Sequence, residues 1–286
     1  MAASLDYQVV DVFTDAAFAG NPLAVVSGAD GLSTGQLQAL ASEFNLSETA
    51  FPLPASSPDA DYRLRIFTPA VELPFAGHPS IGSAWVQREL GRVGDGRVVQ
   101  ECGAGLMPLL IDGDRVTLTG GTPSVGDPVD AAPVLAAVGL DAADLADDGP
   151  VRFASTGLAW GFLPVRPGAL ARCRPDAARL AAQGEAGVAV VAYADGVAHA
   201  RVFAGGAGVF EDPATGSAAL AFGAWLAAAG LVAADGETEY VVQQGLEMGR
   251  PSRLDCVVQC AGGRAVECRV TGSVVAVAEG RIRVPS

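Results

Sequence analysis

The sequence predicts an α+β protein made of two similar halves, each combining several strands with a buried helix. Short apolar runs bounded by Gly, Asp and Pro recur along the 286 residues, as expected of strands. Residues 217–229 form a helical stretch that has no polar face, which indicates a helix buried on all sides. A seven-residue motif at 78–84 returns at 212–218, which indicates an internal repeat.

The first half contains alternating segments and two helical ones. Alternation predicts strands at Tyr7–Phe13, Asp61–Phe67, Arg97–Glu101, Leu106–Ile111 and Arg115–Leu118. The helical period predicts helices at Ser33–Phe44 and Pro79–Leu90. We expect this half to span residues 1–120 and to be joined by a C-terminal strand at 273–286.

The second half, 121–272, restarts the pattern after a pair of glycines. Strands are predicted at Val188–Tyr193, Ala198–Phe203, Glu239–Val242 and Arg264–Val270, and the buried helix at Ser217–Ala229. Residues 127–150 are rich in Ala, Asp and Pro, which is typical of a linker carrying a short surface helix.

Composition excludes several classes of function. A net charge of -14 argues against binding to nucleic acid or to an anionic membrane, because both need a basic surface. All 18 basic residues are arginine, so chemistry that needs a lysine Schiff base or a P-loop lysine is excluded. Five cysteines without a CxxC pair and only two histidines support neither a disulfide framework nor a metal site. We therefore expect reduced thiols, no metal and no cofactor.

From the sequence we expect neither a targeting segment nor a membrane-spanning one. Met1–Gln8 has neither basic residues nor an apolar core, so no signal peptide is expected. The uncharged run Pro213–Ala234 is shortened by glycines to a helix of roughly 18 Å, less than a bilayer needs. We expect a cytoplasmic protein.

The repeated motif has a physical meaning at the start of each helix. His78 and Asp212 are suited to cap a helix, and the proline after each is suited to its first position. Gly and Ser in the first turn leave backbone N–H groups uncovered, which makes each helix start an anion site. If the halves pack pseudo-symmetrically, both helix starts point into one cleft. The alternative is that both are ordinary caps on core helices.

Several long segments resemble the PhzF-like isomerases, and together they cover essentially the whole chain. They are Asp11-Val12-Phe13 with Gly20-Asn21-Pro22, Asn45-Leu46-Ser47-Glu48-Thr49, the run Phe67 to Pro79, the run Glu211 to Ala219, and Gln244-Gly245 with Gly249-Arg250-Pro251-Ser252.

The resemblance implies the diaminopimelate epimerase-like fold, with a curved, mostly antiparallel sheet around a central helix in each half. It also implies a homodimer and a cofactor-independent isomerase that shifts a proton along a small unsaturated carboxylic acid. The reference activity of the family isomerises trans-2,3-dihydro-3-hydroxyanthranilate on the route to phenazines. Related racemases carry a cysteine at each helix start. Ala76 and Asp212-Pro213 stand there in this chain, which disfavours a two-thiol mechanism.

Glu48 is the predicted general acid/base. Its neighbours Leu46, Ala50 and Phe51 suggest the start of an apolar strand, where desolvation raises the pKa of a carboxylate. A lone glutamate is more often a surface residue, and the match of Ser47-Glu48-Thr49 to the family favours catalysis instead.

The other predicted site residues lie at the two motifs. His78 and Asp212 are expected to orient or polarise the substrate, and Ser217 with the N–H groups of Gly77 and Gly216 to hold its carboxylate. A hydrolase triad built on Ser217 is disfavoured because the serine lacks a GxSxG elbow.

Two further motifs are interpreted as structural. Cys102, in Glu101-Cys102-Gly103-Ala104-Gly105, lies between two strands rather than before a helix, which indicates a buried thiol. Gly205-Gly206-Ala207-Gly208 lacks a Rossmann context and departs from the proline-containing segment common in the family.

Two rival functions remain open at this point. One is an epimerase of an amino-acid-like substrate with the same fold, and the other is a non-catalytic protein that binds small acids.

Overall fold

The computed structural model describes residues 4–183, 187–204 and 209–286. The chain divides into two compact units, Met1–Thr119 with Thr271–Ser286, and Gly120–Val270.

In unit 1 the strands form a closed ring. Its elements are β1 (Ser4–Val12), β2 (Asn21–Val26), α1 (Thr34–Phe44), β3 (Glu48–Leu53), β4 (Tyr62–Phe67), β5 (Glu72–Leu73), α2 (Gly77–Glu89), β6 (Gly96–Cys102), β7 (Gly105–Asp112), β8 (Arg115–Thr119) and the end of β17 (Arg264–Arg283). Hydrogen-bonded pairs run β1–β2–β3–β4–β6–β7–β8, and β17 pairs with both β8 and β1. The sheet therefore has the barrel-like closure that removes open edges.

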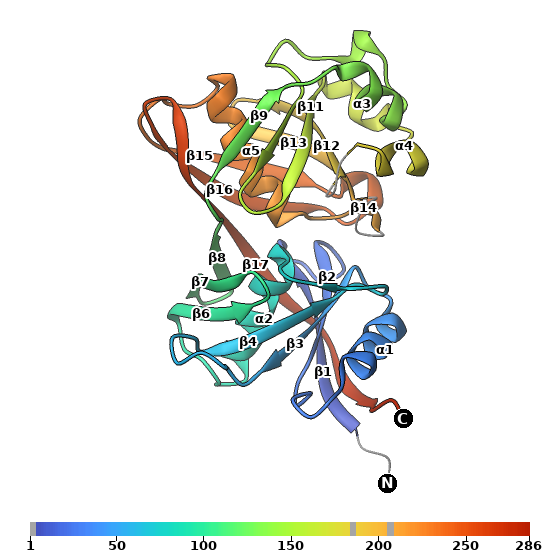
Figure 1. Cartoon of the computed structure of the whole chain (residues 1–286), viewed down its shortest axis with the longest axis vertical. Helices are drawn as coiled ribbons and strands as arrows, with labels where there is room; N and C mark the ends of the chain where they lie inside the picture. Colours follow the sequence, from blue (N-terminus) through green and yellow to red (C-terminus); the bar gives the residue numbers. More distant parts are fainter. Residues whose placement is uncertain (1–3, 184–186, 205–208) are drawn as a thin grey trace. The chain divides into compact units, whose positions relative to one another are not determined.

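The helix α2 runs inside this ring, as Figure 1 shows. Every residue from Gly77 to Gln87 is buried. Gly82 is needed for this packing, because a Cβ there would lie 2.7 Å from Cδ2 of Leu23 and 2.9 Å from Cγ2 of Val12. Small residues thus allow strands to approach the helix from several sides.

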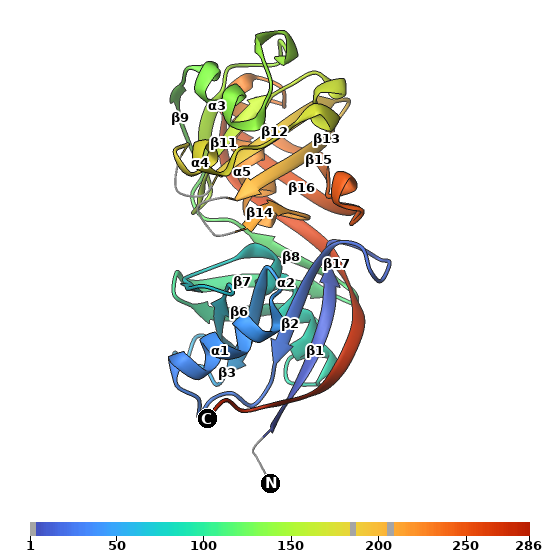
Figure 2. The same ribbon diagram turned by 90° about the vertical axis from the view of Figure 1, so that its right-hand side faces the viewer.

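The helix α1 lies outside the ring, which is clearest in Figure 2. A capping box between Ser33 and Gln36 starts it. Its apolar residues Leu37 and Leu40 pack into the same cluster as Phe51 of β3. One side of the ring is therefore covered by a helix.

Unit 2 repeats the arrangement around α5. Its elements are β9 (Ser124–Pro128), α3 (Ala131–Val138), β10 (Arg152–Ser155), β11 (Ala159–Pro164), the 3₁₀ segment Pro167–Arg172, α4 (Ala177–Ala181), β12 (Gly187–Ala194), β13 (Val197–Ala204), β14 (Val209–Asp212), α5 (Gly216–Ala229), β15 (Gly236–Gln244), β16 (Ser252–Ala261) and the start of β17.

The order of strand pairing is the same in the two units. From β1 to β7 the pairs alternate antiparallel, parallel, antiparallel, parallel and antiparallel. From β10 to β16 they follow the same alternation. The central helix enters at the equivalent place, after β5 or β14. The sequence repeat therefore marks a repeat of the structure.

The strands and helices expected from the sequence are present, including α5, which is buried from Ala218 to Ala227. The short helix expected within residues 127–150 is present as α3, but its interpretation as a surface helix on a linker is wrong. Helix α3 buries Val134, Leu135 and Val138 in the core cluster of unit 2. Three apolar side chains on one face of a short helix are enough to dock it, although alanine and aspartate dominate the composition. In the part of the chain that the structure describes, no helix is long and apolar enough to cross a membrane.

Candidate active site

Glu48 and His78 face each other in unit 1. Glu48 is the first residue of β3, and His78 is the second residue of α2. Oε2 of Glu48 lies 3.5 Å from Nε2 of His78, and the side chains are 13% and 5% exposed. Parallel pairing of β2 with β3 sets Glu48 beside Leu23, whose strand also packs on α2. The pairing therefore brings together residues that are distant in sequence.

His78 is a neutral imidazole at neutral pH. Burial lowers its pKa from 6.5 to about 3. Nδ2 of Asn21 lies 3.2 Å from Nδ1 of the ring. An amide nitrogen can only donate, so Nδ1 accepts, and the ring proton is assigned to Nε2, the atom nearest Glu48. At 3.5 Å the two groups lie beyond ordinary hydrogen-bond distance.

The expected capping roles of His78 and Asp212 are wrong. Ala76 is the N-cap of α2, so His78 lies within the first turn and Pro79 is the third helical residue. Thr215 is the N-cap of α5, and Asp212 ends β14. Helix α2 therefore begins one residue before its copy of the repeated motif, and α5 begins within its copy, so that Pro213 lies before α5 rather than in it.

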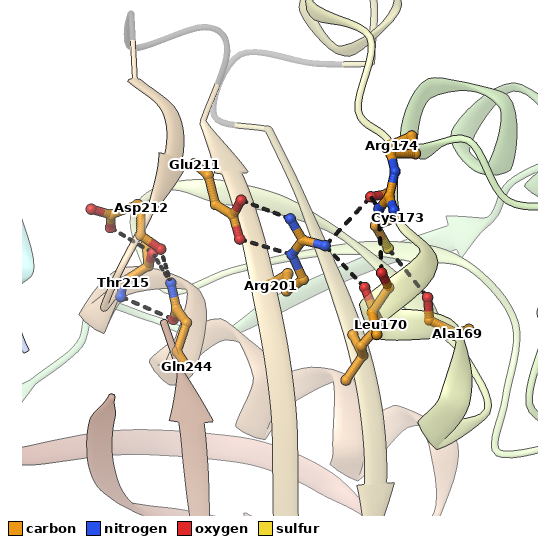
Figure 3. A network of polar contacts seen from close by, with 10 residues as sticks. Ala169, Leu170, Cys173, Arg174, Arg201, Glu211, Asp212, Thr215 and Gln244 are labelled. Atoms are coloured by element: carbon orange, nitrogen blue, oxygen red, sulfur yellow. Dashed lines mark hydrogen bonds and ion pairs between the residues drawn. The ribbon is translucent and has the colours of Figure 1, made fainter. Parts of the chain in front are cut away.

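Asp212 belongs to a buried polar network in unit 2 (Figure 3). Oγ1 of Thr215 lies 2.6 Å from Oδ2 of Asp212. Nε2 of Gln244 donates to Oγ1 of Thr215 at 2.9 Å and to the carbonyl of Asp212 at 2.6 Å. The amide oxygen of Gln244 accepts from the N–H of Thr215 at 3.1 Å. This network fixes the segment between β14 and α5.

An ion pair holds the strand that carries Asp212. Arg201 of β13 binds Glu211 of β14 through two hydrogen bonds of 2.8 Å each. The same guanidinium donates to the carbonyl of Leu170 at 3.0 Å, as Figure 3 shows. A bidentate, mostly buried pair of this kind fixes orientation as well as distance.

Ser217 is held by an indole. Nε1 of Trp160, on β11, donates to Oγ of Ser217 at 3.1 Å. Ser217 is the second residue of α5, where the backbone N–H groups of the first turn have no acceptor within the helix. The hydroxyl and these N–H groups together suit a carboxylate. A serine bound by an indole rather than by an imidazole lacks the base that a hydrolase triad requires.

Each unit thus gathers its own predicted residues. Gly77, His78 and Glu48 lie together in unit 1, and Asp212, Gly216 and Ser217 in unit 2. No role was predicted from the sequence for four further residues, Asn21, Trp160, Thr215 and Gln244. Asn21 begins β2 and Gln244 ends β15, and both stand in the segments that resemble the family, a signal that could have been used.

Of the two motifs interpreted as structural, the first places Cys102 at the end of β6, at the turn to β7. The prediction of a buried thiol there is wrong, because Cys102 is partly exposed at this turn, although desolvation still raises the pKa of its thiol. The glycine segment Gly205–Gly208 lies outside the described residues.

Among the residues that the structure describes, no group of three or more His, Cys, Asp or Glu side chains has the arrangement of a metal site.

Comparison with known proteins agrees with this architecture. The family model for phenazine biosynthesis-like proteins, PhzC-PhzF, matches residues 10–280. An uncharacterised isomerase of Mesorhizobium japonicum is 37% identical, with 97% of this chain and 98% of the relative covered. The trans-2,3-dihydro-3-hydroxyanthranilate isomerase of Pseudomonas aeruginosa is 35% identical, covering 96% and 98%. The crystal structure of a PhzF-family protein from Bacillus anthracis superposes with a TM-score of 0.88 at 28% identity, covering 98% and 99%.

The fold and these relatives define an isomerase with the diaminopimelate epimerase-like architecture, as the sequence predicted. The chain belongs to the phenazine biosynthesis-like, or PhzF, family.

Proposed function

We propose that the protein moves a proton between two carbons of a small unsaturated carboxylic acid, without a cofactor. The observation that carries this proposal is the Glu48–His78 pair, a mostly buried carboxylate beside a neutral imidazole N–H. Glu48 removes a proton from one carbon and returns it to another. The double bond shifts, and substrate and product have the same composition.

His78 supports this step as a hydrogen-bond donor. Removal of the proton leaves negative charge on the conjugated substrate. An N–H directed at that charge stabilises the transition state more than the ground state, which is what accelerates a reaction. A ring whose pKa is about 3 stays neutral at neutral pH, so it donates a hydrogen bond without neutralising Glu48 as an ion pair would.

The substrate carboxylate is assigned to the helix starts. The N–H groups at Gly77 and Gly216 and the hydroxyl of Ser217 are suited to an anion, and Asp212 to a substrate amine or hydroxyl. The homodimer stays a prediction, and so does the use of both units for one substrate. If both units serve one substrate, variants in either unit should impair the same reaction.

Replacing Glu48 with Gln tests the proton transfer. The amide keeps the size of the side chain but removes the proton acceptor, so turnover of trans-2,3-dihydro-3-hydroxyanthranilate, the first substrate to assay, should fall by about 10²–10⁴-fold. Binding of a substrate-like acid should persist, because other groups supply the carboxylate contacts. The matched control is Glu43→Gln on the exposed face of α1, which should leave turnover unchanged.

Deuterium uptake from D₂O separates this proposal from its rivals. The wild type should exchange the transferred proton at least in part with solvent and yield an isomer of different connectivity, whereas Glu48→Gln should do neither. An epimerase would incorporate deuterium and change only configuration. A binding protein would incorporate none. Normal turnover by Glu48→Gln would overturn the proposal, and so would joint loss of ligand binding and stability.

A further inference from the structure

Three buried donors lie behind the groups assigned to the site. Asn21, Trp160 and Gln244 are 0%, 3% and 1% exposed. Their N–H groups are directed at Nδ1 of His78, Oγ of Ser217 and Oγ1 of Thr215, at 3.2, 3.1 and 2.9 Å. Both units therefore use the same arrangement, in which a donor from a strand contacts a polar group at a helix start.

The chemistry of these donors decides where the remaining protons point. An amide nitrogen and an indole nitrogen donate and do not accept. Their partners must therefore accept at the contacted atom. A neutral imidazole has one ring proton and a hydroxyl has one proton, so the proton of each partner must lie elsewhere.

We propose that Asn21, Trp160 and Gln244 are positioning residues that set the proton direction of the groups they contact. Asn21 holds His78 as the Nε2–H tautomer, facing Glu48. Trp160 leaves the proton of Ser217 available to donate to an anion. Gln244 makes Thr215 donate to Oδ2 of Asp212, at 2.6 Å.

The catalytic meaning of these directions rests on the proposed function, but the directions themselves do not. A substrate that gains negative charge needs donors, and a reversed tautomer would present a lone pair instead. In serine proteases, loss of the correct histidine tautomer costs on the order of 10⁴-fold in kcat. An effect of this kind is expected to appear in kcat rather than in KM.

The histidine tautomer can be observed directly. The sequence has only two histidines, and His199 is exposed on β13, so ¹⁵N NMR of labelled protein gives two separable rings. We expect His78 of the wild type to carry its proton on Nε2. The nearly isosteric change Asn21→Asp replaces the donor by an acceptor, so the proton should move to Nδ1 and the pKa of His78 should rise. His199 should not respond.

The second arm of the experiment uses Trp160. Trp160→Phe keeps an aromatic ring but removes the donor, and Ser217→Ala removes the acceptor. With benzoate as the probe acid, each single change should weaken binding by about 5- to 10-fold, the range of one hydrogen bond. In the Ser217→Ala background, Trp160→Phe should have no further effect, because the two act through one contact.

These outcomes are decisive without activity data. A proton on Nδ1 in the wild type, an unchanged tautomer in Asn21→Asp, or additive effects of the Trp160 and Ser217 changes would each overturn the inference. If Asn21→Asp does not fold, Asn21→Ala replaces it and should show a mixture of both tautomers. An inactive wild type with the expected tautomer would contradict the proposed function alone.

Discussion

Acid should destabilise the folded protein through His78. The ring is buried and neutral in the folded state, whereas in the unfolded chain it takes up a proton near its ordinary pKa of 6.5. Between pH 6.5 and about 3 the unfolded state therefore binds more protons than the folded state. The stability contribution is fully present above pH 6.5 and decreases as the pH falls through this window.

The size of the effect follows from the width of the window. Each pH unit inside it corresponds to about 1.4 kcal/mol of unfolding free energy. At pH 4.5, two units below the unfolded pKa, His78 alone should have removed about 3 kcal/mol. For a domain whose total stability is typically about 5–15 kcal/mol, this loss is large.

Urea unfolding at pH 7.5 and 4.5 measures the effect, with His78→Gln as the reference. The variant cannot titrate at this position, so its pH dependence reports all other groups. The stability difference between wild type and variant should become about 3 kcal/mol less favourable to the wild type at the lower pH. If the stability difference between wild type and variant were the same at both pH values, His78 would take up protons equally well in the folded and unfolded states. The description of His78 as a buried, neutral ring would then be wrong.

Two further predictions concern packing and thiols. Gly82→Ala should lower the free energy of unfolding by about 1–3 kcal/mol, because the added Cβ meets Leu23. Gly35→Ala in α1, where the added Cβ meets open space, should be neutral or should stabilise the protein by up to about 1 kcal/mol. Thermal unfolding of the two variants measures the difference. Iodoacetamide should modify Cys102 first and slowly, because the other four cysteines are buried. Intact-mass analysis follows the reaction, and activity should survive it; rapid inactivation through Cys102 would contradict the assignment of Glu48 as the base.

The sequence predicted α5 better than it predicted the groups around it. An uncharged run of Ala, Leu, Phe and Trp that is too short to span a bilayer is expected to form a core helix, so its burial follows from composition and length. By contrast, Ser80, Ser83 and Gln87 are buried in α2, although their polarity suggests an exposed face. They are buried because a ring of strands surrounds the helix, and that ring is made by contacts between distant segments.

The same limit applies to the site. Glu48, His78 and Asp212 could be named from motifs, but their contacts depend on strand register. The partner of His78 is Asn21, at the start of a strand 57 positions away. The capping prediction failed because α2 begins at Gly77, before His78, whereas α5 begins at Gly216, after Thr215. A sequence pattern predicts that a helix exists more reliably than it predicts where the helix begins.

The route of β17 has a consequence for synthesis on the ribosome. The strand begins in unit 2 and continues past residue 271 into unit 1, where it lies between β8 and β1. The first 119 residues therefore emerge without the strand that closes their ring. Unit 2 is contiguous, so it can be complete before unit 1, although it is translated later. We expect the nascent N-terminal segment to keep two open strand edges until the last part of β17 has been translated, and it is then that the chain most needs protection from aggregation.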